Sequence, residues 1–155
     1  MKFRGLIGIL LVGAFPLTAS AQSVTKSPAN EQYLPRLGDI MNNIQLRHIK
    51  LSFAGKAQNW ELAAYELRQL RAGLVEAAVM YDGIPVNNVA TMTAPIDAIG
   101  EAIAAKDGKR FAKLFSELTV GCNGCHQSMD RGYIQMRVPT EQPFSNQVFP
   151  PRGKP

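Results

Sequence analysis

Apolar residues recur at spacings of three and four in four separate segments of the chain. This spacing places one apolar stripe along an α-helix, and such a stripe has to be buried against other helices. The stripes consist of Leu34, Leu37, Met41, Ile44, His48 and Leu51; Trp60, Ala63, Leu67, Leu70, Leu74 and Ala77; Ile96, Ile99 and Ile103; and Phe111, Phe115, Leu118, Cys122, Cys125 and Met129. No convincing strand pattern accompanies them. The sequence therefore predicts an all-α fold.

Residues that typically start or end helices lie between these stripes. Gly55 is expected to end the first helix, and Asn59 to cap the second. The main part of the third helix should begin beside Pro95 after a connection over about residues 82–93, and Asp107 should cap the fourth. Short connections between four helices predict an antiparallel four-helix bundle, in which the first helix starts near the end of the fourth.

The first 21 residues have the three-part pattern of a secretory signal peptide. A basic start that includes Lys2 and Arg4 precedes an apolar run, and the small residues of Ala19-Ser20-Ala21 follow it. The apolar run is shorter than the roughly 20 residues of a membrane-spanning helix, although an uncleaved N-terminal anchor is the alternative. We therefore expect export to the periplasm and cleavage after Ala21.

The remaining chain divides into three parts by composition. We expect residues 22–30 to be a flexible lead-in, residues 31–136 a four-helix domain, and residues 137–155 an extended proline-rich tail, because proline excludes a helix there. Loss of the signal would lower the formal charge from +5 to +3. No glycine-rich phosphate loop and no basic run with interleaved aromatics is present, so we expect no nucleic-acid partner.

The two cysteines lie in the run Gly121–His126, with the sequence GCNGCH. The pattern C-x-x-C-H is the attachment signature of c-type haem. Residues three apart lie on one face of a helix, so the sulfurs of Cys122 and Cys125 can both reach the vinyl groups along one haem edge. His126 lies one turn from Cys122 and can supply an imidazole to the iron. The sequence thus predicts one covalently bound haem c.

Three other interpretations of the cysteine pair are open. A disulfide between residues so close in sequence would close a very small loop and stabilise the fold little. A thioredoxin-like pair belongs beside a strand–helix–strand unit and at the start of a helix, whereas Cys122 and Cys125 lie near a helix end. Structural zinc needs four ligands, and His48 is the only further histidine.

With this motif late in a fourth helix and a signal peptide before the bundle, residues 31 to about 132 resemble the cytochrome c-prime family. Class I cytochromes c instead carry the motif near the N-terminus. The resemblance implies a periplasmic protein. Because a haem with both axial positions filled has no open position for substrate chemistry, we expect that the protein is not an enzyme and has no catalytic residues. Members of this family either carry electrons or bind small gases, and they are often homodimers. We expect single-electron transfer with redox partner proteins, and the alternative is the binding of nitric oxide or carbon monoxide. The 29 residues after His126 are a longer ending than the family usually has.

The resemblance also implies a distal residue on the first helix, at the position of Met41. His48 lies on the same stripe, seven residues or about 10.5 Å further along, so only one of them can face a given iron. If the fourth helix ends near Gly132, His126 lies about 9 Å from that end, against roughly 15 Å from the helix start for Met41 and roughly 25 Å for His48. This favours Met41, either bonded to the iron or packed over it, and a buried, hydrogen-bonded role for His48.

Overall fold

The structure is a computed structural model that describes residues 34–153. The predicted signal peptide, the lead-in and residues 31–33 of the predicted helical domain lie outside these described residues. Within residues 34–153 the fold is all-α, as predicted, and contains helices but no strand. No helix of this part of the chain is long and apolar enough to cross a membrane.

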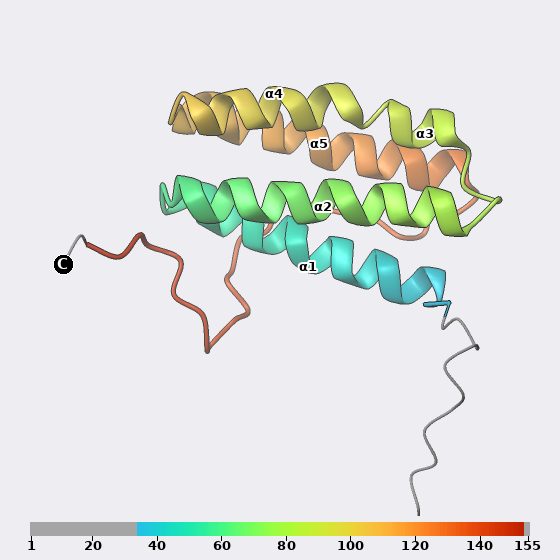
Figure 1. The fold of residues 1–155 in the computed structure, drawn as a ribbon, viewed down its shortest axis with the longest axis horizontal. Coiled ribbons are helices and arrows are strands. Elements are labelled where there is room, and N and C mark those ends of the chain that lie inside the picture. Colours follow the sequence, from blue (N-terminus) through green and yellow to red (C-terminus); the bar gives the residue numbers. More distant parts are fainter. Residues whose placement is uncertain (1–33, 154–155) are drawn as a thin grey trace, which may run out of the picture. The chain divides into compact units, whose positions relative to one another are not determined.

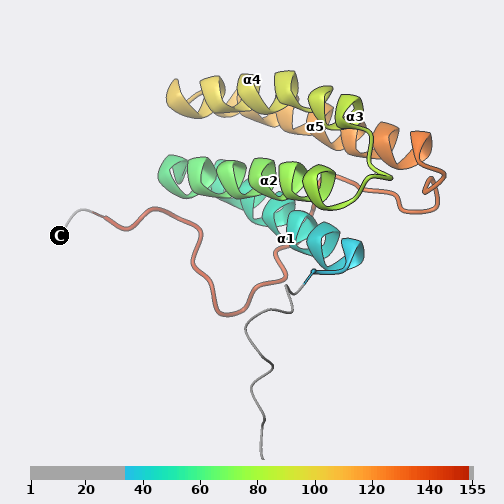
Figure 2. The same cartoon turned by 45° about the vertical axis from the view of Figure 1, so that its right-hand side comes forward.

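The described part of the chain forms four long helices and one short helix. Their bounds are α1 Leu37–Lys56, α2 Trp60–Met80, α3 Val86–Ala90, α4 Thr93–Ala104 and α5 Gly108–Ser128. Helix α1 contacts α2 and α5, while α4 contacts α2 and α5. The first residues of α1 and the last residues of α5 lie at the same end of the molecule in both Figure 1 and Figure 2. This arrangement brings two segments that are distant in sequence to one place.

The predicted helix starts agree with the structure. The side chain of Asn59 accepts a hydrogen bond from the Leu62 backbone N–H at 3.2 Å, and Asp107 accepts one from the Arg110 N–H at 2.9 Å. Caps of this kind typically contribute about 1 kcal/mol each. Pro95 lies in the first turn of α4, where its missing N–H would have no helical partner.

The prediction that Gly55 ends the first helix was wrong. Helix α1 continues through Gly55 to Lys56, and the backbone reaches the left-handed region only at Gln58, with φ 55°. Gly55 is instead buried, and a Cβ atom at this position would overlap the ring of Phe111 on α5. The absence of a side chain therefore serves the close approach of two helices rather than a turn.

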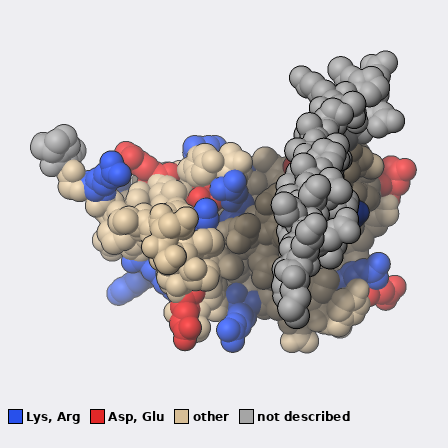
Figure 3. Space-filling model, turned by 90° about the horizontal axis from the view of Figure 1, so that it is seen from below, with Lys and Arg blue, Asp and Glu red and all other residues tan. Residues whose placement is uncertain are grey.

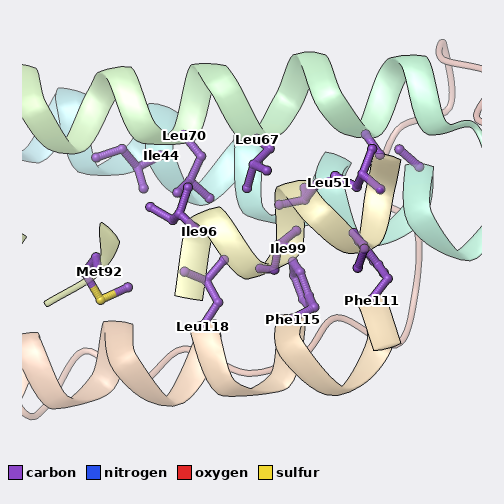
Figure 4. Packing of buried hydrophobic residues seen from close by; sticks show 14 of the residues in the cluster. Ile44, Leu51, Leu67, Leu70, Met92, Ile96, Ile99, Phe111, Phe115 and Leu118 are labelled. Atoms are coloured by element: carbon purple, nitrogen blue, oxygen red, sulfur yellow. The ribbon is translucent and has the colours of Figure 1, made fainter. Parts of the chain in front are cut away.

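The hydrophobic core lies between the two helix pairs, α1 with α2 and α4 with α5. Figure 4 shows Leu51, Leu67, Ile99 and Phe115 from the four long helices pointing toward one another. Each of these side chains is at most 7 % exposed. Truncating a side chain in such a core typically lowers the free energy of unfolding by about 2–5 kcal/mol, so these contacts stabilise the packing of the four helices.

The chain after α5 contains no helix or strand up to residue 153 and returns along α1. The Lys56 ammonium donates to the Pro139 carbonyl at 2.6 Å, and the Asn59 side-chain amide donates to the Phe149 carbonyl at 3.0 Å. Phe149 is 5 % exposed and packs on Phe53, with ring centroids 5.8 Å apart.

On the face drawn in Figure 3, basic and acidic side chains are interspersed wherever grey atoms do not cover it.

Candidate haem site

A cavity of about 370 Å³ lies where the start of α1 meets the end of α5. Its wall also includes residues of α2, of the connection from Ile84 to Met92, and of the segment that follows α5. The residues predicted from the sequence as site residues, Met41, Cys122, Cys125 and His126, all line it. The packing of α1 beside α5 thus brings together residues separated by some 80 positions in the sequence.

The two motif cysteines are half-buried free thiols on α5. Burial raises the pKa of Cys122 to about 11, and the neighbouring Cys125 adds to this; burial also raises the pKa of Cys125. Both lie in the last two turns of the helix, where its dipole disfavours an anion. A thiol–disulfide exchange site needs the opposite, a cysteine whose pKa is lowered at a helix start. These surroundings therefore do not suit a dithiol redox pair.

The imidazole of His126 has a defined tautomer. Its Nδ1 atom lies 2.8 Å from the backbone carbonyl oxygen of Ile134. Because a carbonyl oxygen can only accept, Nδ1 must carry a hydrogen, and in the neutral imidazole the lone pair is then on Nε2. Histidines that bind metals commonly hold their second ring nitrogen in this way, by donating to a carbonyl or a carboxylate. His126 is thus arranged to offer Nε2 as a ligand.

The segment after α5 folds back on the last turns of that helix. Asp130 adopts the left-handed region, with φ 55°, and the Arg131 N–H donates to the His126 carbonyl at 2.7 Å. Further along, the Met136 N–H donates to Asn123 Oδ1 at 2.6 Å, and Asn123 Nδ2 donates to the Met136 carbonyl at 2.9 Å. One of the two residues between the cysteines therefore binds the segment through two hydrogen bonds.

Apart from Met129, which lies on the predicted stripe of the fourth helix, the sequence did not predict that the segment after α5 lines the cavity. Met129, Arg131, Tyr133, Ile134 and Met136 all line the cavity, together with the predicted residues. No helical periodicity marks the positions from Arg131 to Met136. The signal available in the sequence was Asn123 inside the motif, because its side-chain amide can pair with backbone groups. Its partner could not be identified without knowing that the chain reverses after α5.

Met41 lies closer to its helix start than expected, and His126 closer to its helix end. Helix α1 begins at Leu37 and α5 ends at Ser128 rather than near Gly132. Met41 is therefore four residues from the start of α1 and His126 two residues from the end of α5, or about 6 Å and 3 Å along the axes. Since both helices are shorter than expected at the same end of the molecule, the two residues still line one cavity.

His48 is a buried histidine with a neighbour as its hydrogen-bond partner, as predicted, and does not line this cavity. Its Nε2 lies 2.9 Å from Thr119 Oγ1, whose hydroxyl donates to the Phe115 carbonyl at 2.9 Å. The hydroxyl has only one hydrogen, so it must accept from the His48 Nε2–H. Burial lowers the pKa of His48 to about 4, which keeps the imidazole neutral near pH 7.

Within residues 34–153 no group of three or more His, Cys, Asp or Glu residues is placed to hold a metal ion. No protein-family model, curated protein or solved structure gives a significant match to this chain.

Proposed function

We propose that the chain is a periplasmic c-type cytochrome with one haem c, attached through Cys122 and Cys125, that carries single electrons. His126 is its proximal iron ligand. The observation that carries the proposal is the hydrogen bond from His126 Nδ1 to the Ile134 carbonyl, which leaves Nε2 as the ring nitrogen without a hydrogen in the neutral imidazole, on a residue that lines the same cavity as Cys122 and Cys125. The haem would supply a one-electron iron couple whose potential is adjusted by its axial ligands and their hydrogen bonds.

The residues around the cavity fit a haem. Its wall is mostly apolar, with side chains from both helix pairs such as Ile44, Leu74 and Met92, and this suits a flat hydrophobic macrocycle. The thiols of Cys122 and Cys125 are three residues apart on one helix and line the same wall. An apolar wall also limits access of water, which is one of the means by which a protein adjusts a haem potential.

The architecture proposed for this cytochrome is an antiparallel four-helix bundle with an extended proline-rich tail, similar to the cytochrome c-prime family. The contacts of α1 with α2 and α5, and of α4 with α2 and α5, support the bundle. Residues 1–21 would direct the chain to the periplasm, where redox partner proteins are the expected partners and a homodimer is one candidate assembly. With both axial positions of the iron filled there would be no open position for an enzymatic reaction.

The second candidate function is the binding of nitric oxide or carbon monoxide at a five-coordinate haem. Met41 lines the cavity and also packs against the hydrophobic core, so its thioether can act either as a ligand or as a packing group. The other distal candidate, His48, uses its Nε2–H to bind Thr119 and lies outside the cavity wall. The choice between the two functions therefore depends on the bonding of Met41.

The test of the proposal is covalent attachment. The chain is produced in a host with haem-ligation machinery, denatured, and weighed. The expected mass is that of the chain after cleavage at Ala21 plus one haem, and replacing both Cys122 and Cys125 by Ala should abolish the added mass. A wild-type chain without haem, with Cys122 bonded to Cys125, would contradict the proposal.

The optical spectrum of the same preparation separates the two functions. A low-spin, six-coordinate spectrum supports electron transfer. A high-spin, five-coordinate spectrum supports gas binding.

A further inference from the structure

We propose that Asn123 is a positioning residue for His126. Its side chain holds the segment after α5 so that the Ile134 carbonyl receives the hydrogen of His126 Nδ1. The inference rests on the proposed haem function, because it assigns to Asn123 an effect on the iron ligand. We expect Asn123 to act on the His126 imidazole through the chain segment that follows α5.

The side chain of Asn123 pairs with the backbone of Met136. The two hydrogen bonds, 2.6 Å and 2.9 Å long, use both polar atoms of the side-chain amide and both polar groups of the Met136 backbone. They join residues 13 positions apart and are formed by half-buried groups. A hydrogen bond of this kind contributes about 0.5–1.5 kcal/mol, so the pair is a substantial anchor for a short irregular segment.

The segment from Arg131 to Met136 has few other anchors. Tyr133 is 77 % exposed and Ile134 is 45 % exposed, so burial of apolar surface holds the middle of the segment only weakly. The Ile134 N–H is used within the segment, where it donates to the Arg131 carbonyl at 2.8 Å. Between Arg131 and Met136, the bonds to α5 are therefore those made by the side chains of Asn123 and His126 and by the Arg131 N–H.

The position of Met136 restricts the position of Ile134. Two residues of backbone span at most about 7 Å, so fixing the amide of Met136 restricts where the carbonyl of Ile134 can lie. That carbonyl is 2.8 Å from His126 Nδ1. Asn123 and His126 themselves are three residues apart on α5, on neighbouring turns of one face. Helix α5, the side chains of Asn123 and His126, and the segment thus form a closed ring of contacts that includes the imidazole.

The expected consequence concerns the electron donation of the imidazole. Donation of a hydrogen bond from Nδ1 raises the basicity of the ligand nitrogen and fixes the ring orientation. A more basic ligand stabilises the oxidised iron relative to the reduced iron. Loss of the Asn123 anchor should therefore raise the reduction potential.

The experiment compares the wild-type holoprotein with Asn123→Leu, Asn123→Ala and Gly124→Ala. Leucine has nearly the shape of asparagine without its hydrogen-bonding groups, and neither leucine nor alanine adds a charge that would itself shift the potential. Alanine serves as the second test if the leucine variant does not fold. Gly124 is the other residue between the cysteines, and a Cβ there meets no atom within 4 Å, so Gly124→Ala is the matched control.

Three quantities are measured in each protein: haem retained after denaturation, the reduction potential, and the hydrogen-exchange rate of the Met136 amide. In Asn123→Leu and Asn123→Ala the Met136 amide should exchange roughly fivefold faster. The potential should rise on the order of 59 mV, which corresponds to a tenfold change for a one-electron couple. Gly124→Ala should match the wild type in both.

Two results would overturn the proposal while haem attachment stands. One is an unchanged potential in a variant whose Met136 amide has lost its protection, because the segment would then not act on His126. The other is wild-type exchange of Met136 in the Asn123 variants, because the anchor would then lie elsewhere. If the wild type itself retains no haem, the proposed function fails, and nitrogen NMR of His126 then tests the positioning role of Asn123. Loss of the Nδ1–H tautomer in Asn123→Leu supports this role, and an unchanged tautomer rejects it.

Discussion

His48 on α1 donates its Nε2–H to the hydroxyl of Thr119 on α5, over 2.9 Å, inside the core. No partner for the His48 Nδ1 atom is found among the described residues. Burial without a counter-charge lowers the pKa of this imidazole from 6.5 to about 4. The unfolded chain therefore takes up a proton at a pH where the folded protein does not.

The first prediction is a loss of stability in acid that originates at His48. The pKa of His48 is lower in the folded protein than in the unfolded chain. The contribution of the neutral imidazole to stability is therefore fully present above about pH 6.5 and is lost as the pH falls toward 4. The size of this loss is on the order of 3 kcal/mol in the free energy of unfolding. Urea unfolding at several pH values measures it, and His48→Gln, which keeps a donor for Thr119, should flatten the slope. Equal slopes in the two proteins would contradict the assignment.

The second prediction concerns the proximal ligand. His126→Ala should abolish the native haem spectrum, since it removes Nε2 and also the hydrogen bond to Ile134. Gln127→Ala is the control, because Gln127 is exposed on the same turn of α5 and does not line the cavity. A native spectrum in His126→Ala would show that another residue binds the iron.

The third prediction separates Met41 from His48 by optical spectroscopy. Met41→Ala should shift a low-spin spectrum toward high spin and allow carbon monoxide to bind, because Met41 lines the cavity. His48→Gln should leave the spectrum unchanged and alter stability, because His48 is bonded to Thr119. If the wild type is already high spin, Met41 is a packing residue and the gas-binding function is favoured. A spectral change in His48→Gln alone would reject the assignment of the distal position to Met41.

The fourth prediction concerns the contact between Gly55 and Phe111. Gly55→Ala should destabilise the fold by about 1–3 kcal/mol, because the added methyl group overlaps the Phe111 ring and forces the helices apart. Gly38→Ala is the control on the same helix, since a Cβ there meets no atom within 4 Å. Thermal or urea unfolding gives both values. Equal stability of the two variants would mean that α1 and α5 can separate at little cost.

Much of the local structure follows from the sequence because its causes act over short distances. Asn59 and Asp107 each cap a helix through an N–H three residues further on, so the asparagine and aspartate before an apolar stripe are sufficient to predict them. The spacing of Cys122, Cys125 and His126 is likewise a local property, because three residues make nearly one helical turn. The all-α fold follows from the same periodicity.

The contacts that complete the site depend on the tertiary structure. Glycine is typical of a helix end, but the role of Gly55 is set by its contact with Phe111, which lies 56 positions further along the chain. The pairing of Asn123 with Met136 requires the chain to reverse after α5, and the pairing of His48 with Thr119 requires α1 to lie against α5. Sequence periodicity shows which face of a helix is buried, but the identity of the opposing residue depends on how the helices pack and where each one ends.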